Sequence, residues 1–477
     1  MNEGPGITVD QMMEKAIFAS AVFSLMDQEH TDRIVRAVYE AGFNARVKLA
    51  KMAAEETGIG RWEDKVIKNV VATQLVYEDI KDLKTVGIIS EDKERGIAEV
   101  AQPMGPILAI IPVTNPTSTV MFKILSALKA RNPIIICPSK KAIQCCAEAA
   151  RICYEAAMSQ DAPEDCIQWL TQVSREQTQE LMSHPKLALI LATGGGGLVR
   201  SAYSSGTPAM GVGAGNVPVF IEKSADIPFA VEQILISKTF DNGTICASEQ
   251  ALVVDGSVAD FVVAEFKKRG AYFLSAAEIP LLEKVAWDAK KKSMNPDVVG
   301  QPPEVIARMA GLTIPPGTRL LIVPLEGVGH GYPLSSEILA PILAFYHAPD
   351  FDGAVKICID LNYHGGIGHT VSIFSNDDDR INQFSILMNA GRIVVNTPSS
   401  QGAVGSIYNA LSPSLTLGCG TGGKNITTEN VTARNLLNIQ RITRRRPNLR
   451  MAQFDVSKYL DESLDARAIE AEYNRNY

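Results

Sequence analysis

A chain of 477 residues is too long for one ordinary hydrophobic core, so we expect two or three domains. Hydrophobic residues make up 46% of the chain and charged residues 21%, a balance typical of globular rather than disordered proteins. The net charge of −7 argues against a nucleic-acid partner, and no segment is long and apolar enough to predict a membrane span.

The eight cysteines show no paired spacing of the CxxC kind, although Cys145 and Cys146 are adjacent. In a chain of this length, scattered thiols indicate a reduced protein rather than a disulfide framework. Residues 1–30 carry acidic side chains throughout and lack the apolar run of a secretory signal. We therefore expect a cytoplasmic protein. The six histidines show no metal-ligand spacing, so no metal is expected.

The chain begins with a predicted helical layer over residues 8–57. Thr8 and Gln11 have the spacing of a capping box, and a second amphipathic run extends from Thr31 to Glu56 and stops at Gly58. An N-terminal helix that docks onto a partner is the alternative to a packed layer.

From Ile97 onward, apolar runs alternate with helical patterns. Continuous apolar strands separated by helices predict a parallel sheet covered on both faces, which is the architecture of a dinucleotide-binding domain. The expected strands are 107–111, 133–137, 166–171 and 187–191, and the expected helices are 117–128, 141–159, 176–183 and 198–204.

A second α/β stretch is predicted from about Ala225 to Gln401. A Gly- and Ser-rich segment over 401–424 is expected to be a loop-dense return. The tail from Arg441 begins with a basic cluster and turns acidic at Asp455, which suits a solvated extension or a helix that packs on a neighbouring subunit. The clearest strands of the second stretch are 250–254, 320–324 and 392–396.

Cys246 lies in the phrase FDNGTICASEQ over 240–250, between a Gly-containing turn and an expected strand. That position favours an accessible thiol. An attacking cysteine must be a thiolate, and a free thiol has a pKa of about 8.5, so it needs a helix N-terminus or a nearby positive charge. A buried core cysteine is the alternative.

The run Gly194–Gly197 follows one expected strand and precedes an expected helix. Exposed backbone N–H groups at a helix N-terminus favour a pyrophosphate. The run is not a GxGxxG fingerprint, and a tight turn between strand and helix is the alternative.

Seven separated motifs, in order, resemble the aldehyde dehydrogenase superfamily and specifically its CoA-acylating branch. That branch includes the aldehyde half of bifunctional aldehyde–alcohol dehydrogenases and the acylating succinate-semialdehyde and sulfoacetaldehyde dehydrogenases. The resemblance covers roughly residues 10–440. The motifs are EDKVIKN (63–69), TNPTST (114–119), ATGGGG (192–197), AYSSGTPAMGVGAGN (202–216), TFDNGTICASEQ (239–250), GGIGHT (365–370) and LTLGCG (415–420).

The resemblance implies an α/β, aldehyde dehydrogenase-like fold with a Rossmann-type cofactor domain, an α/β catalytic domain and small bridging strands. We expect N-terminal helices and the dinucleotide-binding domain over 1–224 and the catalytic domain over 225–404. A return segment with an oligomerisation strand follows over 405–445, and a tail over 446–477. Strands near 88–105 and 425–445 would bridge the subunits of a homodimer or homotetramer.

The matched cysteine makes Cys246 the nucleophile that adds to the aldehyde carbon, after which hydride leaves to the nicotinamide and a thioester remains. Asn115 falls at the position of the family's oxyanion asparagine, with the Cys246 backbone N–H as the second donor. Each preorganised donor can contribute roughly 3 kcal/mol. A turn residue before Pro116 is the alternative for Asn115.

Cys137 stands where hydrolytic relatives carry a lysine that contacts the adenosine ribose. Lys140 and Lys141 are placed to receive a 2′-phosphate or merely to solubilise a helix start, so NAD and NADP both remain open. Glu337 matches the glutamate that holds the nicotinamide ribose, the alternative being a surface carboxylate. The implied cofactor-binding residues are Thr193, Gly194, Gly195, Gly213, Glu337, Pro138, Ser139 and Lys140.

Hydrolytic relatives carry a general-base glutamate in the motif that corresponds to residues 211–216, and this chain has no carboxylate there. A positioned base typically contributes 10²–10⁴-fold, so the thioester is expected to await the thiol of CoA. His369 matches a histidine that could deprotonate CoA, because imidazole titrates near neutrality. A structural histidine in a Gly-rich turn is the alternative.

Thr114, Ile245 and Lys424 are the candidate substrate-contacting residues, with Lys424 either pairing with an anionic aldehyde or simply exposed to solvent. The sequence ends at Tyr477 without an alcohol dehydrogenase half, so we expect a separate enzyme to supply or consume the aldehyde. An acyl-phosphate reductase of the same superfamily and a catalytically silent scaffold remain as alternatives. The sequence leaves the aldehyde itself open.

Overall fold

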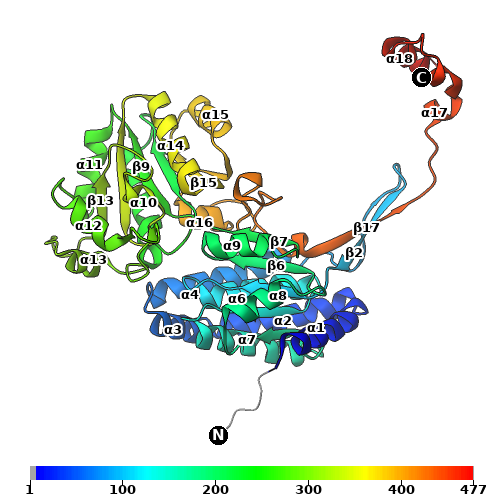
Figure 1. Ribbon diagram of the computed structural model, residues 1–477, viewed down its shortest axis with the longest axis horizontal. Helices are drawn as coiled ribbons and strands as arrows, with labels where there is room; N and C mark the ends of the chain where they lie inside the picture. Colours follow the sequence, from blue (N-terminus) through cyan, green and yellow to red (C-terminus); the bar gives the residue numbers. More distant parts are fainter. Residues whose placement is uncertain (1–6, 476–477) are drawn as a thin grey trace, which may run out of the picture. The chain divides into compact units, whose positions relative to one another are not determined.

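The computed structural model describes residues 7–475 (Figure 1). Residues 1–6 of the expected first domain and 476–477 of the expected tail lie outside the described residues. The chain divides into two compact units, one of Met1–Leu83 with Pro103–Leu437 and the other of Lys84–Gln102 with Asn438–Tyr477. This division differs from the four expected segments because the second unit joins two distant parts of the sequence.

The N-terminal layer is helical, as the sequence predicts. The Thr8 hydroxyl accepts the Gln11 N–H at 3.2 Å and the Gln11 side chain accepts the Thr8 N–H at 3.0 Å, which confirms the capping box. The expected second run is split at Ala45 into two helices, and the later one ends at Gly58 in the left-handed region, with φ 65°. The helices are α1 (Val9–Ser24), α2 (Gln28–Asn44), α3 (Arg46–Thr57), α4 (Trp62–Val70) and α5 (Val76–Ile80), with a π-helical turn at Val71–Leu75 before α5.

A five-stranded parallel sheet follows, in the order β5-β4-β3-β6-β7. Helices α1, α8 and α9 contribute to the core on one face, while α6 and α7 pack together and also contact the strands. This confirms the covered parallel sheet expected from the apolar strands. Its elements are β3 (Ile107–Ile110), α6 (Pro116–Lys129), β4 (Ile134–Cys137), α7 (Ile143–Met158), β5 (Ile167–Trp169), α8 (Arg175–Met182), β6 (Leu189–Thr193), α9 (Gly196–Tyr203) and β7 (Ala209–Val212).

The second sheet has seven parallel strands in the order β10-β13-β14-β9-β8-β15-β16. Strand β8 (Val217–Ile221) lies inside it, so this sheet begins before the expected boundary at residue 224. The other strands are β9 (Glu249–Asp255), β10 (Ala271–Phe273), β13 (Leu320–Pro324), β14 (Ile342–Ala348), β15 (Gly368–Phe374) and β16 (Ala390–Val395). Its helices are α10 (Ile227–Thr239), α11 (Ala259–Lys268), α12 (Ile279–Ala286), α13 (Pro303–Ala310), α14 (Phe351–Gly365), α15 (Asp378–Leu387) and α16 (Ser399–Val404), and a short hairpin pairs β11 (Trp287–Asp288) with β12 (Ser293–Met294).

The second unit is a small three-stranded sheet followed by the tail. Strands β1 (Gly87–Asp92) and β2 (Ile97–Pro103) form an antiparallel hairpin, and β17 (Leu437–Thr443) lies on the free side of β2. The two segments expected to carry bridging strands therefore pair with each other. The tail contains α17 (Leu449–Gln453) and α18 (Ala466–Asn474). Among the described residues, no helix is long and apolar enough to cross a membrane.

Phe220 on β8 should be a main determinant of stability, because its fully buried ring packs against Phe351 and Phe384. We expect Phe220→Ala to lower the free energy of unfolding by about 3–5 kcal/mol, since it leaves a cavity in the core. Phe261→Ala, whose ring is 52% exposed on α11, should change it by less than about 0.5 kcal/mol. Chemical unfolding followed by circular dichroism measures both, and equal midpoints for the two variants would contradict this assignment of the core.

Candidate active site

A cavity of about 440 Å³ lies at the carboxyl ends of β3, β4 and β6 and extends to the loop that carries Cys246. That volume is within the usual range for small-molecule and cofactor sites. In an open α/β sheet such a crevice is expected where the strand order reverses, here between β3 and β6. The predicted site residues that line it are Thr114, Asn115, Pro138, Ser139, Lys140, Thr193, Gly194, Gly195, Gly213, Cys246 and Glu337.

Cys246 follows α10 and the short 3₁₀ turn Phe240–Gly243. All eight cysteines lie within residues 7–475, and Cys246 alone is partly exposed while the other seven are buried. Burial raises the pKa of the Cys246 thiol to about 12, with a further contribution from the negative charge of Glu337, while Arg392 and the Cys246 N–H oppose the shift. The raised pKa favours the thiol form of Cys246 in the free protein, and the positive charge of Arg392 offsets only part of the shift.

His369 does not line the cavity, although its ring lies close to the Cys246 backbone. Its buried ring contacts the Thr370 hydroxyl through Nδ1 at 2.9 Å, and Nε2 has no partner among the described residues. A Cβ placed on Gly215 would lie 3.2 Å from the ring and 2.1 Å from the Cys246 carbonyl oxygen, so ring, turn and nucleophile are close neighbours.

The pKa of His369 differs from the near-neutral value assumed from the sequence. Burial, with Arg392 adding to it, lowers that pKa to about 3. The imidazole is therefore neutral at physiological pH, and its Nε2 has no partner among the described residues. A catalytic role for His369 stays a prediction.

The β6–α9 turn fits the pyrophosphate of a dinucleotide. Gly195 is the N-cap residue of α9 with no side-chain cap, and a Cβ on Gly195 or on Gly213 would meet nothing within 4 Å. The Thr193 hydroxyl, which also lines the cavity, is buried without a partner among residues 7–475. Open space, an uncapped helix N-terminus and an unpaired hydroxyl are the features that an anionic ligand would satisfy.

Glu337 reaches the same cavity from the loop before β14. Its Oε1 accepts the Gly215 N–H at 2.9 Å, and burial raises its pKa to about 7. The segment 211–216 thus has a carboxylate beside it, although none within it. The linear sequence gave no signal for this contact, because the two residues are 122 positions apart.

Asn115 is the N-cap residue of α6, at the end of the loop that follows β3. Its Nδ2 lies 3.1 Å from the Thr114 hydroxyl and 3.4 Å from the Thr244 carbonyl oxygen, while its Oδ1 accepts from Lys68 Nζ at 2.6 Å. Asn115 and Cys246 line the same cavity, as an oxyanion site requires.

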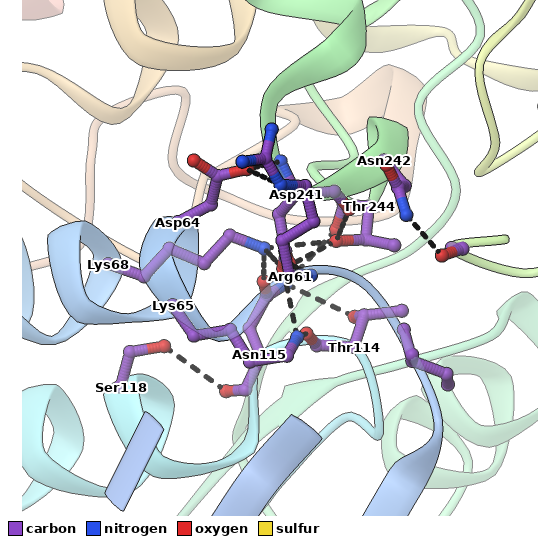
Figure 2. Close-up of polar contacts among 12 residues, drawn as sticks. Arg61, Asp64, Lys65, Lys68, Thr114, Asn115, Ser118, Asp241, Asn242 and Thr244 are labelled. Atoms are coloured by element: carbon purple, nitrogen blue, oxygen red, sulfur yellow. Dashed lines mark hydrogen bonds and ion pairs between the residues drawn. The ribbon is translucent and has the colours of Figure 1, made fainter. Parts of the chain in front are cut away.

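A buried polar network surrounds Asn115 (Figure 2). Lys65 and Lys68 extend from α4 toward Asp241, and all three side chains are at most 3% exposed. These residues belong to motifs that the sequence analysis used only for the resemblance. The signal in the sequence that could have indicated buried lysines was their spacing, since Lys65 and Lys68 are three positions apart and so share one face of a helix.

Ile245 faces a second, smaller cavity whose walls are mainly apolar. Lys424 is exposed, in the left-handed region with φ 62°, and it does not line either of these two cavities. The structure therefore does not bring Lys424 together with the other predicted site residues. The small cavity is lined by Ile67, Lys68, Val71, Phe240, Ile245, Ser400, Gln401, Val404, Ile407 and Leu415.

Comparisons with known proteins identify the family of the chain. The model of the Aldehyde dehydrogenase family matches residues 3–274. The bifunctional aldehyde-alcohol dehydrogenase AdhE of Escherichia coli K12 is 45% identical over 445 residues, which are 92% of this chain and 50% of AdhE. The chain thus spans about half the length of that relative. It belongs to the aldehyde dehydrogenase family, which confirms the resemblance and the fold class.

Solved structures add further similarity. An acetylating aldehyde dehydrogenase from Geobacillus thermoglucosidasius is 48% identical with a TM-score of 0.89, and the match covers 92% of this chain and 97% of that one. A propionaldehyde dehydrogenase from Rhodopseudomonas palustris, solved with bound CoA and an acylated cysteine, is 26% identical with a TM-score of 0.83. That match covers 92% of this chain and 97% of the other.

The raised pKa of Cys246 predicts how the thiol reacts in the free protein. Alkylation of Cys246 by iodoacetamide should be slower than that of free cysteine and should rise without a plateau between about pH 6 and pH 10, because the thiolate fraction grows tenfold per pH unit below the pKa. Peptide mass spectrometry at each pH measures it, with Cys246→Ala as the blank. A plateau below pH 8 would show that the thiolate is stabilised instead.

Proposed function

We propose that the chain catalyses the reversible oxidation of a short aldehyde to an acyl-CoA, with NAD or NADP as hydride acceptor. The observation that carries the proposal is the shared cavity of Cys246, Asn115 and the open Gly195 turn. Relatives named as acetylating, and one crystallised with CoA and an acylated cysteine, support it. An engineered glycolyl-CoA reductase with bound NADP+, 28% identical, supports the dinucleotide.

In this reaction the Cys246 thiol gives its proton to solvent, and Sγ forms a bond to the aldehyde carbon as the C=O double bond becomes a single bond. The carbonyl oxygen becomes an oxyanion that receives the Asn115 amide N–H and the Cys246 backbone N–H. Each donor of this kind contributes roughly 3 kcal/mol to the transition state. The bound dinucleotide would supply the hydride acceptor. The Gly195 turn and Glu337 would hold its pyrophosphate and ribose, and the acyl group remains on Cys246 as a thioester.

Hydrolysis of that thioester needs a base for water, and residues 211–216 provide none. The one carboxylate that lines the cavity, Glu337, accepts the Gly215 N–H and would be held by the ribose. Asn216, at the end of this segment, is committed to structure, since its Nδ2 donates to the Ser335 and Leu361 carbonyl oxygens at 2.8 and 2.9 Å. The CoA thiolate attacks the acyl carbon and Cys246 leaves as a thiolate. One thioester replaces another, so the reaction is close to balanced and runs in both directions.

The direct test is the formation of NAD(P)H from a short aldehyde with and without CoA. We expect turnover to require CoA and to fall by at least about 10³-fold in Cys246→Ala, because the acyl carrier is lost. Both dinucleotides are tested. Turnover without CoA would point to hydrolysis. Reduction of an acyl phosphate without CoA would point to the related acyl-phosphate reductases. Activity in the alanine variant would refute the thioester mechanism.

We propose further that the aldehyde is uncharged. The cavity that Cys246 and Asn115 line is mainly apolar, and its one cationic side chain, Lys140, is assigned to the dinucleotide. A carboxylate or sulfonate in this cavity would lose its hydration without gaining a free counter-charge.

The size and charge of the aldehyde provide a separate prediction. Acetaldehyde and propionaldehyde should exceed succinate semialdehyde and sulfoacetaldehyde in kcat/KM by at least about tenfold, which corresponds to roughly 1.4 kcal/mol of differential binding. Initial rates at saturating CoA and dinucleotide measure it. A preference for either anion would show that another cation, such as Lys424, reaches the substrate.

We also propose a cytoplasmic homodimer or homotetramer. The eight unpaired cysteines support a reducing compartment. The sheet β1-β2-β17 supports assembly, because its two outer strands leave backbone groups available for pairing with another subunit.

A further inference from the structure

Lys68 makes the shortest contact to Asn115. Its Nζ lies 2.6 Å from Asn115 Oδ1 and 3.0 Å from Thr244 Oγ1, and it also donates to Asp241 Oδ2 (Figure 2). With Oδ1 fixed by Lys68, the Nδ2 group is directed toward the Thr114 hydroxyl at 3.1 Å and, through a long contact of 3.4 Å that a stronger acceptor could replace, toward the Thr244 carbonyl oxygen two residues before Cys246. We infer that Lys68 is a positioning residue that fixes the Asn115 amide so that Nδ2 faces the oxyanion, an inference that rests on the proposed function.

The donors of Lys68 are fully used. An ammonium group has three N–H donors, and Lys68 has three acceptors, one each from Asn115, Asp241 and Thr244. None remains for substrate, although the Lys68 side chain also borders the small apolar cavity. Lys68 therefore acts through Asn115 rather than on the aldehyde itself.

Asp241 anchors the arrangement to the loop of the nucleophile. Its buried carboxylate accepts the Arg61 N–H at 2.6 Å, Lys65 Nζ at 2.9 Å and the Thr244 hydroxyl at 2.9 Å, in addition to Lys68. Its backbone has φ 48°, a left-handed conformation that is uncommon for any residue but glycine, and its N–H donates to Asp64 at 2.9 Å.

This anchor links the two oxyanion donors. Thr244, which bonds both Lys68 and Asp241, stands two residues before Cys246, and its carbonyl oxygen lies 3.4 Å from Asn115 Nδ2. The amide of Asn115 and the N–H of Cys246 are thus held by one set of contacts. Asn115 is in a loop of the five-stranded sheet, and Cys246 is in a loop of the seven-stranded sheet.

A purely structural ion pair is the competing explanation, and Lys65 offers a matched control. Lys65 is on the same helix, is as buried as Lys68 and bonds the same Asp241 oxygen, but its other contact is the Thr114 carbonyl oxygen at 3.2 Å and not the Asn115 amide. Loss of either lysine removes an ion pair to Asp241. Only loss of Lys68 frees the Asn115 amide.

The experiment is a double-mutant cycle of Lys68→Met with Asn115→Ala, and of Lys65→Met with Asn115→Ala. The reaction is the acylation of Cys246 by p-nitrophenyl acetate, which needs neither dinucleotide nor CoA. The Cys246 Sγ bonds to the acetyl carbon, the ester C–O bond breaks, p-nitrophenolate leaves and the thiol proton passes to solvent. The burst of p-nitrophenolate, absent in Cys246→Ala, reports the rate.

We expect Asn115→Ala to slow acylation by about 10²–10³-fold and Lys68→Met by about 10–100-fold. In the Asn115→Ala background, Lys68→Met should cost less than about threefold, whereas the Lys65→Met loss should be the same in both backgrounds. Lys68→Gln keeps an N–H donor for Asn115 Oδ1 and should recover part of the rate. If Lys68→Met does not fold, Lys68→Gln replaces it in the cycle.

Equal losses from Lys68 substitution with and without Asn115 overturn the inference. So does a Lys68→Gln variant no faster than a folded Lys68→Met. A protein whose acylation obeys the cycle but which forms no NAD(P)H from aldehydes and CoA retains the inference and loses the proposed function.

Discussion

In the five-stranded sheet, β3 and β6 are neighbours. The chain continues from β3 to β4 on one side of this pair and from β6 to β7 on the other side. The loops and helices that follow must therefore diverge, and a crevice opens between their carboxyl ends. Asn115 begins α6 at one side of the crevice, and Gly195 begins α9 at the other. The second sheet contributes Cys246 to the same space through the loop before β9. Each group of the proposed reaction depends on this divergence.

Burial disfavours the charged forms of the titratable groups that lie at or near Cys246. Burial holds Cys246 as a thiol, Glu337 near the midpoint of its titration at neutral pH and His369 as neutral imidazole. The oxyanion of the proposed reaction would then develop in a buried site where the nearest fixed charges, Lys65, Lys68 and Asp241, are paired with one another. Oriented N–H dipoles act most strongly there, because the low polarity weakens their screening.

The fold was predictable from the sequence to a large extent, because strands buried on both faces are continuous apolar runs. Residues 107–110 and 134–137 are examples of such strands. The end of α3 was also predictable, because Gly58 adopts the left-handed conformation that ends a helix. Local patterns also marked Cys246 and the Gly194–Gly197 turn.

Contacts between distant segments were not predictable. Glu337 meets Gly215 and Lys68 meets Asn115 only after both sheets have formed, and the pKa of His369 depends on burial that no motif encodes. The place of β8 in the second sheet was missed for a similar reason. Strand partners are set by packing, whereas a run of apolar residues reports only that a strand exists.

Two buried lysines near the crevice illustrate how the surroundings decide what such a charge does. Lys123 donates to the Ile110 and Leu191 carbonyl oxygens, both at 2.8 Å, and so ties β3 to β6 where the crevice opens. Without a carboxylate beside it, burial lowers the pKa of Lys123 to about 7. Lys68 is buried as deeply, yet Asp241 offsets part of the cost and its pKa falls only to about 8. The carboxylate thus helps to keep Lys68 protonated, and only the protonated form supplies all three of its donors, one of them to Asn115.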